Sequence, residues 1–429
     1  MTSAHLQSIH GAVPFTVPAQ WQVLTHAAFS DLPAKGTAGE LVAKALSAPV
    51  NALPLNKRLA ADNTVAIIVE DLTRCSPKKE ILPVLLEELD AIGIPPDNIC
   101  IVIALGTHRA LSKKELASGY GADITARYRF INHDCHAPDQ VAIGELQTGG
   151  IVKINRYVYE ADFRIGIGSI FPHPLNGFGG GGKILFPGVA DFQSIFEHHL
   201  KYSFVGQARL GNIDGNEFFQ EVTRLALAGR LDFIINSVLD HRDRLYDLVC
   251  GDPEKAHEVG TRICKRAIAK EFDRPADVTI ISAYPYTEGP QIMKPLAPAL
   301  DTTRKGGCII LYADCCAPLP EIYFDACQRF RIQHGADLRQ AVLSYFADNR
   351  PILTNQPPEL NMSLAQVLLA VNDYHVILVS KDIPKKNVEQ LGFLHAPDLK
   401  DAITKSSDFF TSPTAHIIPS GGIILPVVQ

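Results

Sequence analysis

Short apolar runs rich in β-branched residues alternate along this chain with segments whose apolar residues recur at helical spacing. The run at 64–69 precedes a helix-spaced segment at 78–93, and further apolar runs follow at 99–104 and 162–170. A strand that is apolar at every position must be buried on both faces, and helices on both sides of a parallel sheet provide that burial. The alternation therefore predicts an α/β fold built on a doubly wound parallel sheet.

Two short patterns predict where helices begin. Ser76 and Pro77 stand directly before the segment at 78–93, in the order typical of an N-cap and a first helical residue. Ser112 and Glu115 have the spacing of a capping box, in which each side chain bonds the backbone of the other residue. We expect one helix to start at each of these places.

The same alternation starts again in the last third of the chain. Apolar runs that read as strands lie within 274–284, 306–316, 374–380 and 415–428. A length of 429 residues also favours more than one domain. We therefore expect two Rossmann-like α/β domains that face a central cleft, an N-terminal domain at 1–270 and a C-terminal domain at 271–429.

Composition excludes several classes of protein. Hydrophobic residues make up 46% of the chain and charged residues 20%, as in a soluble globular protein. A net charge of −6 argues against nucleic acid or an anionic membrane as the main partner. The nine cysteines form no C-x-x-C pair, which favours reduced thiols. With no signal peptide or transmembrane run visible, we expect a cytoplasmic protein.

Charged and polar side chains follow four of the predicted strands. Parallel sheets of this kind bind ligands at the carboxyl ends of their strands, so these residues are candidates for one site. The residues are Asp71 and Arg74, His108, His173 and Lys183, and, in the second domain, Gln291 and Lys294.

The glycine-rich stretch at 172–188, PHPLNGFGGGGKILFPG, nearly matches a phosphate-binding P-loop. A P-loop needs a Ser or Thr hydroxyl after its lysine to hold Mg²⁺, and this chain has Ile184 there. Glycines such as Gly181 and Gly182 let the backbone approach a ligand closely. Lys183 can then either pair with a phosphate or act as a nucleophile that becomes covalently attached.

Two histidine-containing segments allow a metal site. Adjacent His198 and His199 point about 100° apart on a helix, so at most one of them faces a given site. A lone histidine does not hold a metal well, so other ligands are needed. The segment NHDCH at 132–136 crowds its possible ligands into one loop, and we interpret it as structural.

Six segments together resemble the nickel-dependent lactate racemase family, in the correct order over essentially the whole chain. They are DLTR (71–74), GTHR (106–109), GSIFPHPLNGFGGGGKILFPG (168–188), HH (198–199), QIMK (291–294) and IPSGGIILP (418–426). The central histidine–glycine–lysine motif is far more specific than a glycine run alone. The family works with a nickel-pincer nucleotide, a pyridinium mononucleotide that holds Ni through two sulfurs and one ring carbon.

The resemblance implies a role for each candidate residue. Lys183 would form a covalent thioamide link to the cofactor, and His199, rather than the competing His198, would complete the nickel coordination. His108 and His173 would be the two catalytic histidines. The remaining matches to polar residues around cofactor and substrate are Asp71, Arg74, Gln291 and Lys294, beside the cofactor-binding glycines Gly181 and Gly182.

The implied reaction is racemisation or epimerisation of a 2-hydroxy acid. Removing hydrogen as hydride avoids a dianion, and a metallated pyridinium ring is a suitable acceptor. One histidine takes the hydroxyl proton, a 2-keto acid forms, and the second histidine serves the other enantiomer. Arg74 and Lys294 can hold the carboxylate or polarise the carbonyl. Cofactor-synthesis enzymes are implied partners, and the oligomeric state is left open.

Two departures from the family pattern affect the substrate. Lactate-specific members have a Tyr directly before the Gln of Q-x-x-K, where this chain has Pro290, and a Trp in the second domain, whereas the single Trp here is Trp21. Three other functions stay open: a P-loop-like hydrolase or kinase, a Zn²⁺ hydrolase using the histidines, and a non-enzymatic protein that binds a nucleotide or an anionic metabolite.

Overall fold

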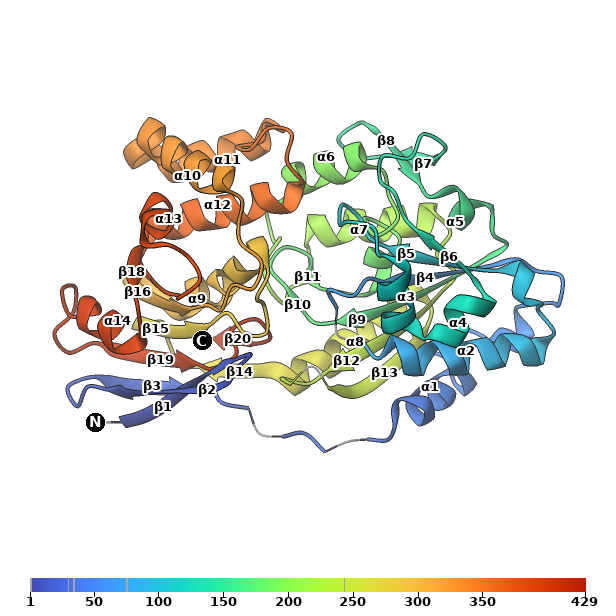
Figure 1. Ribbon diagram of the computed structural model, residues 1–429, viewed down its shortest axis with the longest axis horizontal. Coiled ribbons are helices and arrows are strands. Elements are labelled where there is room, and N and C mark those ends of the chain that lie inside the picture. Colours follow the sequence, from blue (N-terminus) through green and yellow to red (C-terminus); the bar gives the residue numbers. More distant parts are fainter. Residues whose placement is uncertain (1, 30, 34, 75, 243) are drawn as a thin grey trace. The chain divides into compact units, whose positions relative to one another are not determined.

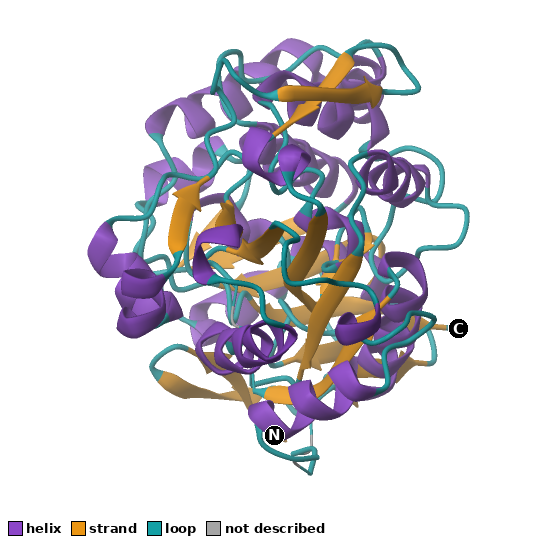
Figure 2. Cartoon of the chain, turned by 90° about the vertical axis from the view of Figure 1, so that its right-hand side faces the viewer, coloured by secondary structure: helices purple, strands orange, loops and turns teal. Residues whose placement is uncertain are grey.

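The computed structural model describes residues 2–429 except 30, 34, 75 and 243. The chain forms two compact units: the central unit, Asp31–Ala267, and the terminal unit, which joins residues 1–30 to Ile268–Gln429. Both units contain helices packed against a mainly parallel sheet (Figure 2). The α/β fold expected from the sequence is confirmed.

The central unit holds one large sheet. Its strands are β4 (Val65–Glu70), β5 (Ile99–Ala104), β6 (Arg129–Asn132), β9 (Phe163–Ile170), β12 (Phe233–Leu239) and β13 (Leu245–Gly251). Two small hairpins add β7 (Val141–Glu145) with β8 (Ile151–Ile154), and β10 (Pro172–His173) with β11 (Gly177–Phe178). The 3₁₀ helices are η1 (Leu55–Lys57), η2 (Pro96–Asn98) and η3 (Gly181–Ile184). The α-helices are α1 (Ala38–Ser47), α2 (Lys78–Ile92), α3 (Lys113–Tyr120), α4 (Ala122–Arg127), α5 (Arg156–Glu160), α6 (Phe192–Tyr202), α7 (Glu217–Ala228) and α8 (Pro253–Ile268).

The strand order of this sheet is β13-β12-β9-β4-β5-β6 (Figure 1). All neighbours are parallel except β13, which pairs antiparallel with β12. Counted outward from β4, this is the order of a Rossmann fold, and the direction of winding reverses between β4 and β9. Every residue of β4 and β9 is buried, as the all-apolar runs predict for strands covered on both faces.

The terminal unit is organised in the same way. Its strands are β1 (Thr2–Ser8), β2 (Gly11–Val17), β3 (Gln22–His26), β14 (Ala269–Phe272), β15 (Ala276–Ser282), β16 (Thr303–Tyr312), β17 (His375–Val379), β18 (Leu394–Ala396), β19 (Thr414–Ile418) and β20 (Leu425–Val428). Its helices are η4 (Gly289–Met293), α9 (Leu296–Thr302), α10 (Glu321–His334), η5 (Gly335–Asp337), α11 (Leu338–Ala347), α12 (Pro358–Asp373), α13 (Lys385–Gln390) and α14 (Leu399–Ser406). The main sheet is entirely parallel, in the order β18-β17-β16-β15-β19-β3.

The first strands of the chain lie in the terminal unit, which the expected division into 1–270 and 271–429 did not anticipate. Strand β3 adds to the edge of the sheet beside β19, and β1 and β2 form a hairpin. Leu6, Val17 and Trp21 pack into the apolar core of this unit. The physical reason is burial: these apolar side chains, with Ala4 and Phe15, complete a core whose remaining buried members come from residues after 270.

The two predicted helix starts had different outcomes. Ser112 and Glu115 form the capping box at the start of α3. The assignment of Ser76 as N-cap is wrong by one residue, because α2 begins at Lys78 and its N-cap is Pro77, which makes no side-chain bond. The Ser76 hydroxyl is used differently, as an acceptor for the Lys78 ammonium at 3.4 Å.

Candidate functional site

The switch point of the central sheet gathers the sequence candidates of this unit. Asp71 directly follows β4, and the chain that leaves β9 carries His173 and Lys183. His108 follows β5, the neighbour of β4 on the other side. Loops leaving neighbouring strands at a switch point diverge, which opens a crevice at the carboxyl ends of those strands. The topology therefore brings these side chains to one edge of the sheet.

Asp71 and His108 form a carboxylate–imidazole pair. The Oδ2 of Asp71 lies 2.5 Å from Nδ1 of His108. Burial of Asp71 would raise its pKa, but the hydrogen bond and charge of His108 and the charge of Arg74 lower it below the ordinary range. An ionised Asp71 can only accept a hydrogen bond, so Nδ1 of His108 carries the proton that it donates. In an uncharged ring the other nitrogen, Nε2, then carries a lone pair. The His108 side chain is 30% exposed.

Hydrogen bonds hold the loop that carries Asp71 and Arg74 in place. The Thr73 hydroxyl and backbone N–H both donate to Asp71 Oδ1, at 2.6 and 3.0 Å. The buried ammonium of Lys78 donates to the Arg74 carbonyl at 2.6 Å and lies 3.8 Å from the carboxylate of Glu70. This network sets the backbone from which the Arg74 side chain projects.

His173 is held by main-chain groups. Its Nδ1 accepts hydrogen bonds from the backbone N–H groups of Leu175 and Asn176, at 3.3 and 3.1 Å. An uncharged imidazole has one donor and one acceptor nitrogen, so its proton is on Nε2. This Nε2 lies 3.5 Å from Nζ of Lys183. The ring is buried, in the hairpin formed by β10 and β11.

Lys183 lies in η3, the 3₁₀ helix that follows the glycine run. Burial and the nearby charge of Arg74 lower the pKa of its ammonium from 10.5 to about 7. Its Nζ lies 5.8 Å from the ring centre of Phe218, on α7. A lysine whose pKa is near neutrality has a large uncharged fraction, and the uncharged amine is the nucleophilic form.

The glycine run is packed against protein on the sides where side chains would stand. A Cβ on Gly181 would come within 2.7 Å of the His257 ring, and a Cβ on Gly182 within 2.8 Å of Ala226. Gly181 also has a φ of +57°, and its N–H donates to the Asn236 side chain at 2.8 Å. The loop therefore needs glycine for internal packing, and its main chain sets the position of Lys183.

The local structure does not fit a P-loop. A P-loop leads into an α-helix whose N-terminus faces the phosphates. Here Lys183 lies within the four-residue 3₁₀ helix η3, and Ile184 is buried. The next α-helix begins only at Phe192.

The adjacent histidines of α6 differ sharply. His198 is fully buried among Phe186, Phe218 and Tyr202, and neither ring nitrogen makes a hydrogen bond to the described residues. Burial lowers its pKa well below the ordinary value, and the charges of His199 and Lys183 act in the same direction. The Nδ1 of His199 lies 2.8 Å from the Ile195 carbonyl, so Nδ1 carries the proton and Nε2 carries a lone pair. Burial and the charge of Lys183 lower the pKa of His199 to about 3, which keeps that lone pair free of a proton at neutral pH.

Phe218 links these groups. Its ring centre lies 6.4 Å from that of His173, 5.2 Å from that of His199 and 4.4 Å from that of His198, besides its contact with Lys183. Nothing in the sequence singled this residue out. The only signal was its place on the apolar face of an amphipathic helix, which is shared by most core residues.

Within the described residues, no group of three or more His, Cys, Asp or Glu side chains could hold a metal ion. In the loop at 132–136, His133 Nε2 lies 2.8 Å from the Ala190 carbonyl, and its Nδ1 lies near the Asn155 amide.

The terminal unit holds the remaining candidates at its own switch point, between β15 and β19. Gln291 lies in η4, which follows β15, and Lys294 directly follows η4. The Nζ of Lys294 lies 4.9 Å from the ring centre of Tyr286. The Oε1 of Gln291 is buried and has no hydrogen-bond partner among the described residues. The Gly421-Gly422 pair after β19 bonds back to the carbonyls of Ser282 and Tyr284.

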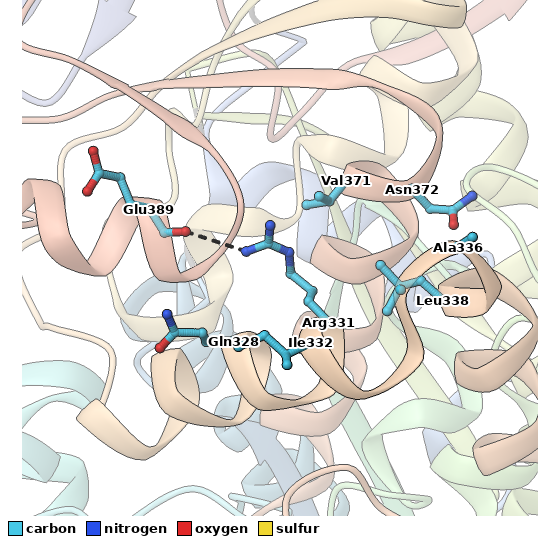
Figure 3. A pocket seen from close by; sticks show the side chains of 9 residues that line it. Gln328, Arg331, Ile332, Ala336, Leu338, Val371, Asn372 and Glu389 are labelled. Atoms are coloured by element: carbon cyan, nitrogen blue, oxygen red, sulfur yellow. Dashed lines mark hydrogen bonds between the residues drawn. The ribbon is translucent and has the colours of Figure 1, made fainter.

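A surface pocket of about 640 Å³ lies elsewhere in the terminal unit, between α10, α11, α12 and α13 (Figure 3). The Arg331 guanidinium crosses it and donates to the carbonyls of Glu389 and Gln390, at 3.4 and 3.2 Å. None of the residues that line it is a sequence candidate. Arg331 is occupied by main-chain carbonyls, so the pocket offers no converging set of reactive groups.

No helix among the described residues has the length and apolar character to cross a membrane. The eight cysteines in the described part of the chain are free thiols.

Comparison with known proteins gives related sequences. A family model for the lactate racemase N-terminal domain matches residues 10–211. A lactate racemase from Thermoanaerobacterium thermosaccharolyticum is 32% identical over 282 residues, and one from Lactiplantibacillus plantarum is 33% identical over 278 residues. Each alignment covers 64% of this chain, but only 66% of the first relative and 65% of the second.

Solved structures share the fold. The lactate racemase apoprotein from Thermoanaerobacterium thermosaccharolyticum superposes with a TM-score of 0.88 at 24% identity, covering 99% of this chain and all (100%) of that one. A protein from Thermotoga maritima has a TM-score of 0.67 at 20% identity, covering 93% of this chain and 100% of that one. Residues 10–211 thus match the lactate racemase N-terminal domain, and the chain as a whole shares its fold with a lactate racemase apoprotein.

Proposed function

We propose that this chain is a racemase or epimerase of 2-hydroxy acids that uses a covalently bound nickel-pincer nucleotide. The observation that carries the proposal is Lys183, whose pKa of about 7 leaves much of its amine uncharged beside His173. Two sequence relatives named lactate racemase support the type of reaction. The proposal includes a cytoplasmic location, where free thiols such as those of this chain stay reduced.

The residues present fit such a cofactor. His199 offers one unprotonated ring nitrogen, which suits a metal that carries its other donors on the cofactor itself. Lys183 would form the covalent bond, and Gly181 and Gly182 would contribute through the main chain that positions it. When bound, the cofactor supplies an electron-poor carbon that accepts hydride and returns it.

The chain's own residues would handle protons and charge. Asp71 holds the Nδ1–H of His108, so His108 Nε2 can take the proton of the substrate hydroxyl. His173 carries a proton on Nε2, which can donate a hydrogen bond to the carbonyl oxygen of the 2-keto acid, and acting as the base for the other enantiomer would require the ring to give up its Nδ1 bonds. Arg74 would bind the carboxylate or the carbonyl oxygen. In the terminal unit, Gln291 and Lys294 are the proposed substrate-binding residues. Because Pro290 stands where lactate-specific members of the family have a Tyr, the acids tested should extend beyond lactate.

The test is mass and metal analysis of protein produced together with the cofactor-synthesis enzymes. Wild-type protein should show a cofactor-sized mass increase under denaturing conditions and racemise one member of a panel of lactate, aryl, dicarboxylic and sugar 2-hydroxy acids. Lys183→Arg should show neither, because a guanidinium is too weak a nucleophile at neutral pH. His199→Ala should keep the mass increase and lose most of the nickel.

Lys153→Arg is the matched control, since this lysine is exposed on β8 of the same unit and the substitution is the same. It should keep the adduct, the nickel and the activity. Wild-type protein that racemises a 2-hydroxy acid without any covalent adduct would overturn the proposed link to Lys183.

A further inference from the structure

The surroundings of Lys183 are unfavourable to an ammonium ion. The groups that interact with its charge are Arg74, His173, His198 and His199. The carboxylates on elements packed against η3 are engaged elsewhere: Glu70 accepts bonds from Ser169, Glu221 accepts bonds from Arg224, and Glu217 accepts a bond from the Gln207 backbone. A positive charge at Lys183 therefore lacks a compensating carboxylate among its described interactions.

The orientation of His173 adds a specific constraint. Two backbone N–H groups bond its Nδ1, so the ring cannot present a lone pair at Nε2 without losing those bonds. Its Nε2–H faces Nζ of Lys183 at 3.5 Å. An ammonium has donors only, so it cannot accept from Nε2–H, whereas an uncharged amine can.

We propose that His173 acts before catalysis, as the positioning residue that holds the Lys183 amine uncharged for attack on an electrophilic carbon of an incoming ligand. The inference deepens the proposed function and rests on it for the identity of that ligand. The contact is long, which suits a group that must release the amine once the ligand arrives. In this role His173 prepares the enzyme for loading, separately from any proton it moves during turnover.

The test labels the full-length protein, prepared without the cofactor pathway, with methyl isothiocyanate. The lysine nitrogen adds to the thiocarbonyl carbon, and its proton moves to the reagent nitrogen, so the reaction needs no leaving group or oxidant. The rate at which Lys183 is modified is followed by peptide mass spectrometry between about pH 5 and pH 10. The rate should rise with pH to half its maximum near 7, because the proton that blocks the amine is lost there.

In His173→Gln the side-chain carbonyl can accept from an ammonium and would stabilise the charged form. The midpoint should rise by about one pH unit or more, with a reaction roughly fivefold slower or more at pH 7. His133→Gln is the matched control, because it changes a buried histidine of the same unit that bonds Ala190 and Asn155 instead. Its Lys183 midpoint should equal that of the wild type.

Circular dichroism establishes which variants are folded, and His173→Asn replaces His173→Gln if the latter is not. A wild-type midpoint close to the ordinary 10.5, or an unchanged midpoint in a folded His173 variant, would overturn the inference. The assay needs neither cofactor nor turnover. Absence of racemase activity with a low midpoint would therefore reject the proposed function alone, and a normal midpoint in an active enzyme would reject only the role of His173.

Discussion

His108 and His173 follow strands of one sheet, yet different kinds of group orient their rings. A carboxylate, Asp71, holds the Nδ1 of His108, whereas two backbone N–H groups hold the Nδ1 of His173. The first arrangement leaves a lone pair on Nε2, and the second leaves a proton there. A lone pair on Nε2 can accept a proton, whereas an Nε2–H on an uncharged ring can donate a hydrogen bond, so the two rings start with different capacities.

The Asp71 carboxylate and the backbone N–H groups that hold His173 also differ in which changes can remove them. Asp71 is a side chain, so a substitution or a change of charge removes its effect on His108. The N–H groups of Leu175 and Asn176 belong to the main chain, and only a change in the backbone of the loop displaces them. His108 is also partly exposed, whereas His173 is buried beside Lys183. The comparison predicts that single substitutions affect the two histidines by different routes.

The largest loss of turnover is expected when the carboxylate that holds His108 is replaced. Asp71→Asn removes the charge that fixes the His108 tautomer, and an amide can equally bond the opposite tautomer. By analogy with other carboxylate-backed catalytic histidines, the turnover number should fall by about 10³- to 10⁴-fold. Chiral chromatography of the product measures this rate, and the mass of the cofactor adduct should not change. Activity within about tenfold of the wild type would show that Asp71 does not orient the base.

A smaller effect, on the free energy of unfolding, is expected when the loop that carries Lys183 is overpacked. Gly181→Ala places a methyl group 2.7 Å from the His257 ring, in the loop that carries Lys183. Gly149→Ala is the matched control, since Gly149 also has a positive φ, of +85°, but nothing lies within 4 Å of its Cβ position.

Urea denaturation should give a free energy of unfolding about 1–3 kcal/mol lower for Gly181→Ala than for Gly149→Ala, the usual cost of overpacking. Equal stabilities would mean that His257 moves aside freely, and that the glycine at 181 is not required by packing.

The smallest loss of turnover is expected at Thr73, which bonds Asp71 and not His108 itself. Thr73→Val removes the hydroxyl that donates to Asp71 Oδ1 at 2.6 Å, while the backbone N–H of residue 73 and the bond to His108 remain. One lost hydrogen bond to a charged group is worth about 1.5–3 kcal/mol at most, partly recovered by water. Turnover should therefore fall by roughly tenfold, far less than in Asp71→Asn. A loss as large as that of Asp71→Asn would place the hydroxyl itself in the reaction.

Much of the central unit could be predicted from the sequence because its signals are local. The apolar runs identified β4, β5 and β9, since a strand buried on both faces has no polar positions. The same reasoning placed Asp71, His108 and Lys183 at strand ends, where a parallel sheet brings ligand-binding residues together. The capping box at Ser112 was predicted for a similar reason, as all its parts lie within four residues.

The sequence by itself thus determined the fold class and most of the candidate residues, because periodicity and motif spacing are properties of short stretches of chain. Tertiary structure alone decided three other things, because each depends on contacts between distant residues. It brought β3 into the sheet of the terminal unit. It explained the glycines by the packing of His257 and Ala226. It also separated His199 from His198, since burial and one carbonyl, that of Ile195, set which ring nitrogen carries a lone pair.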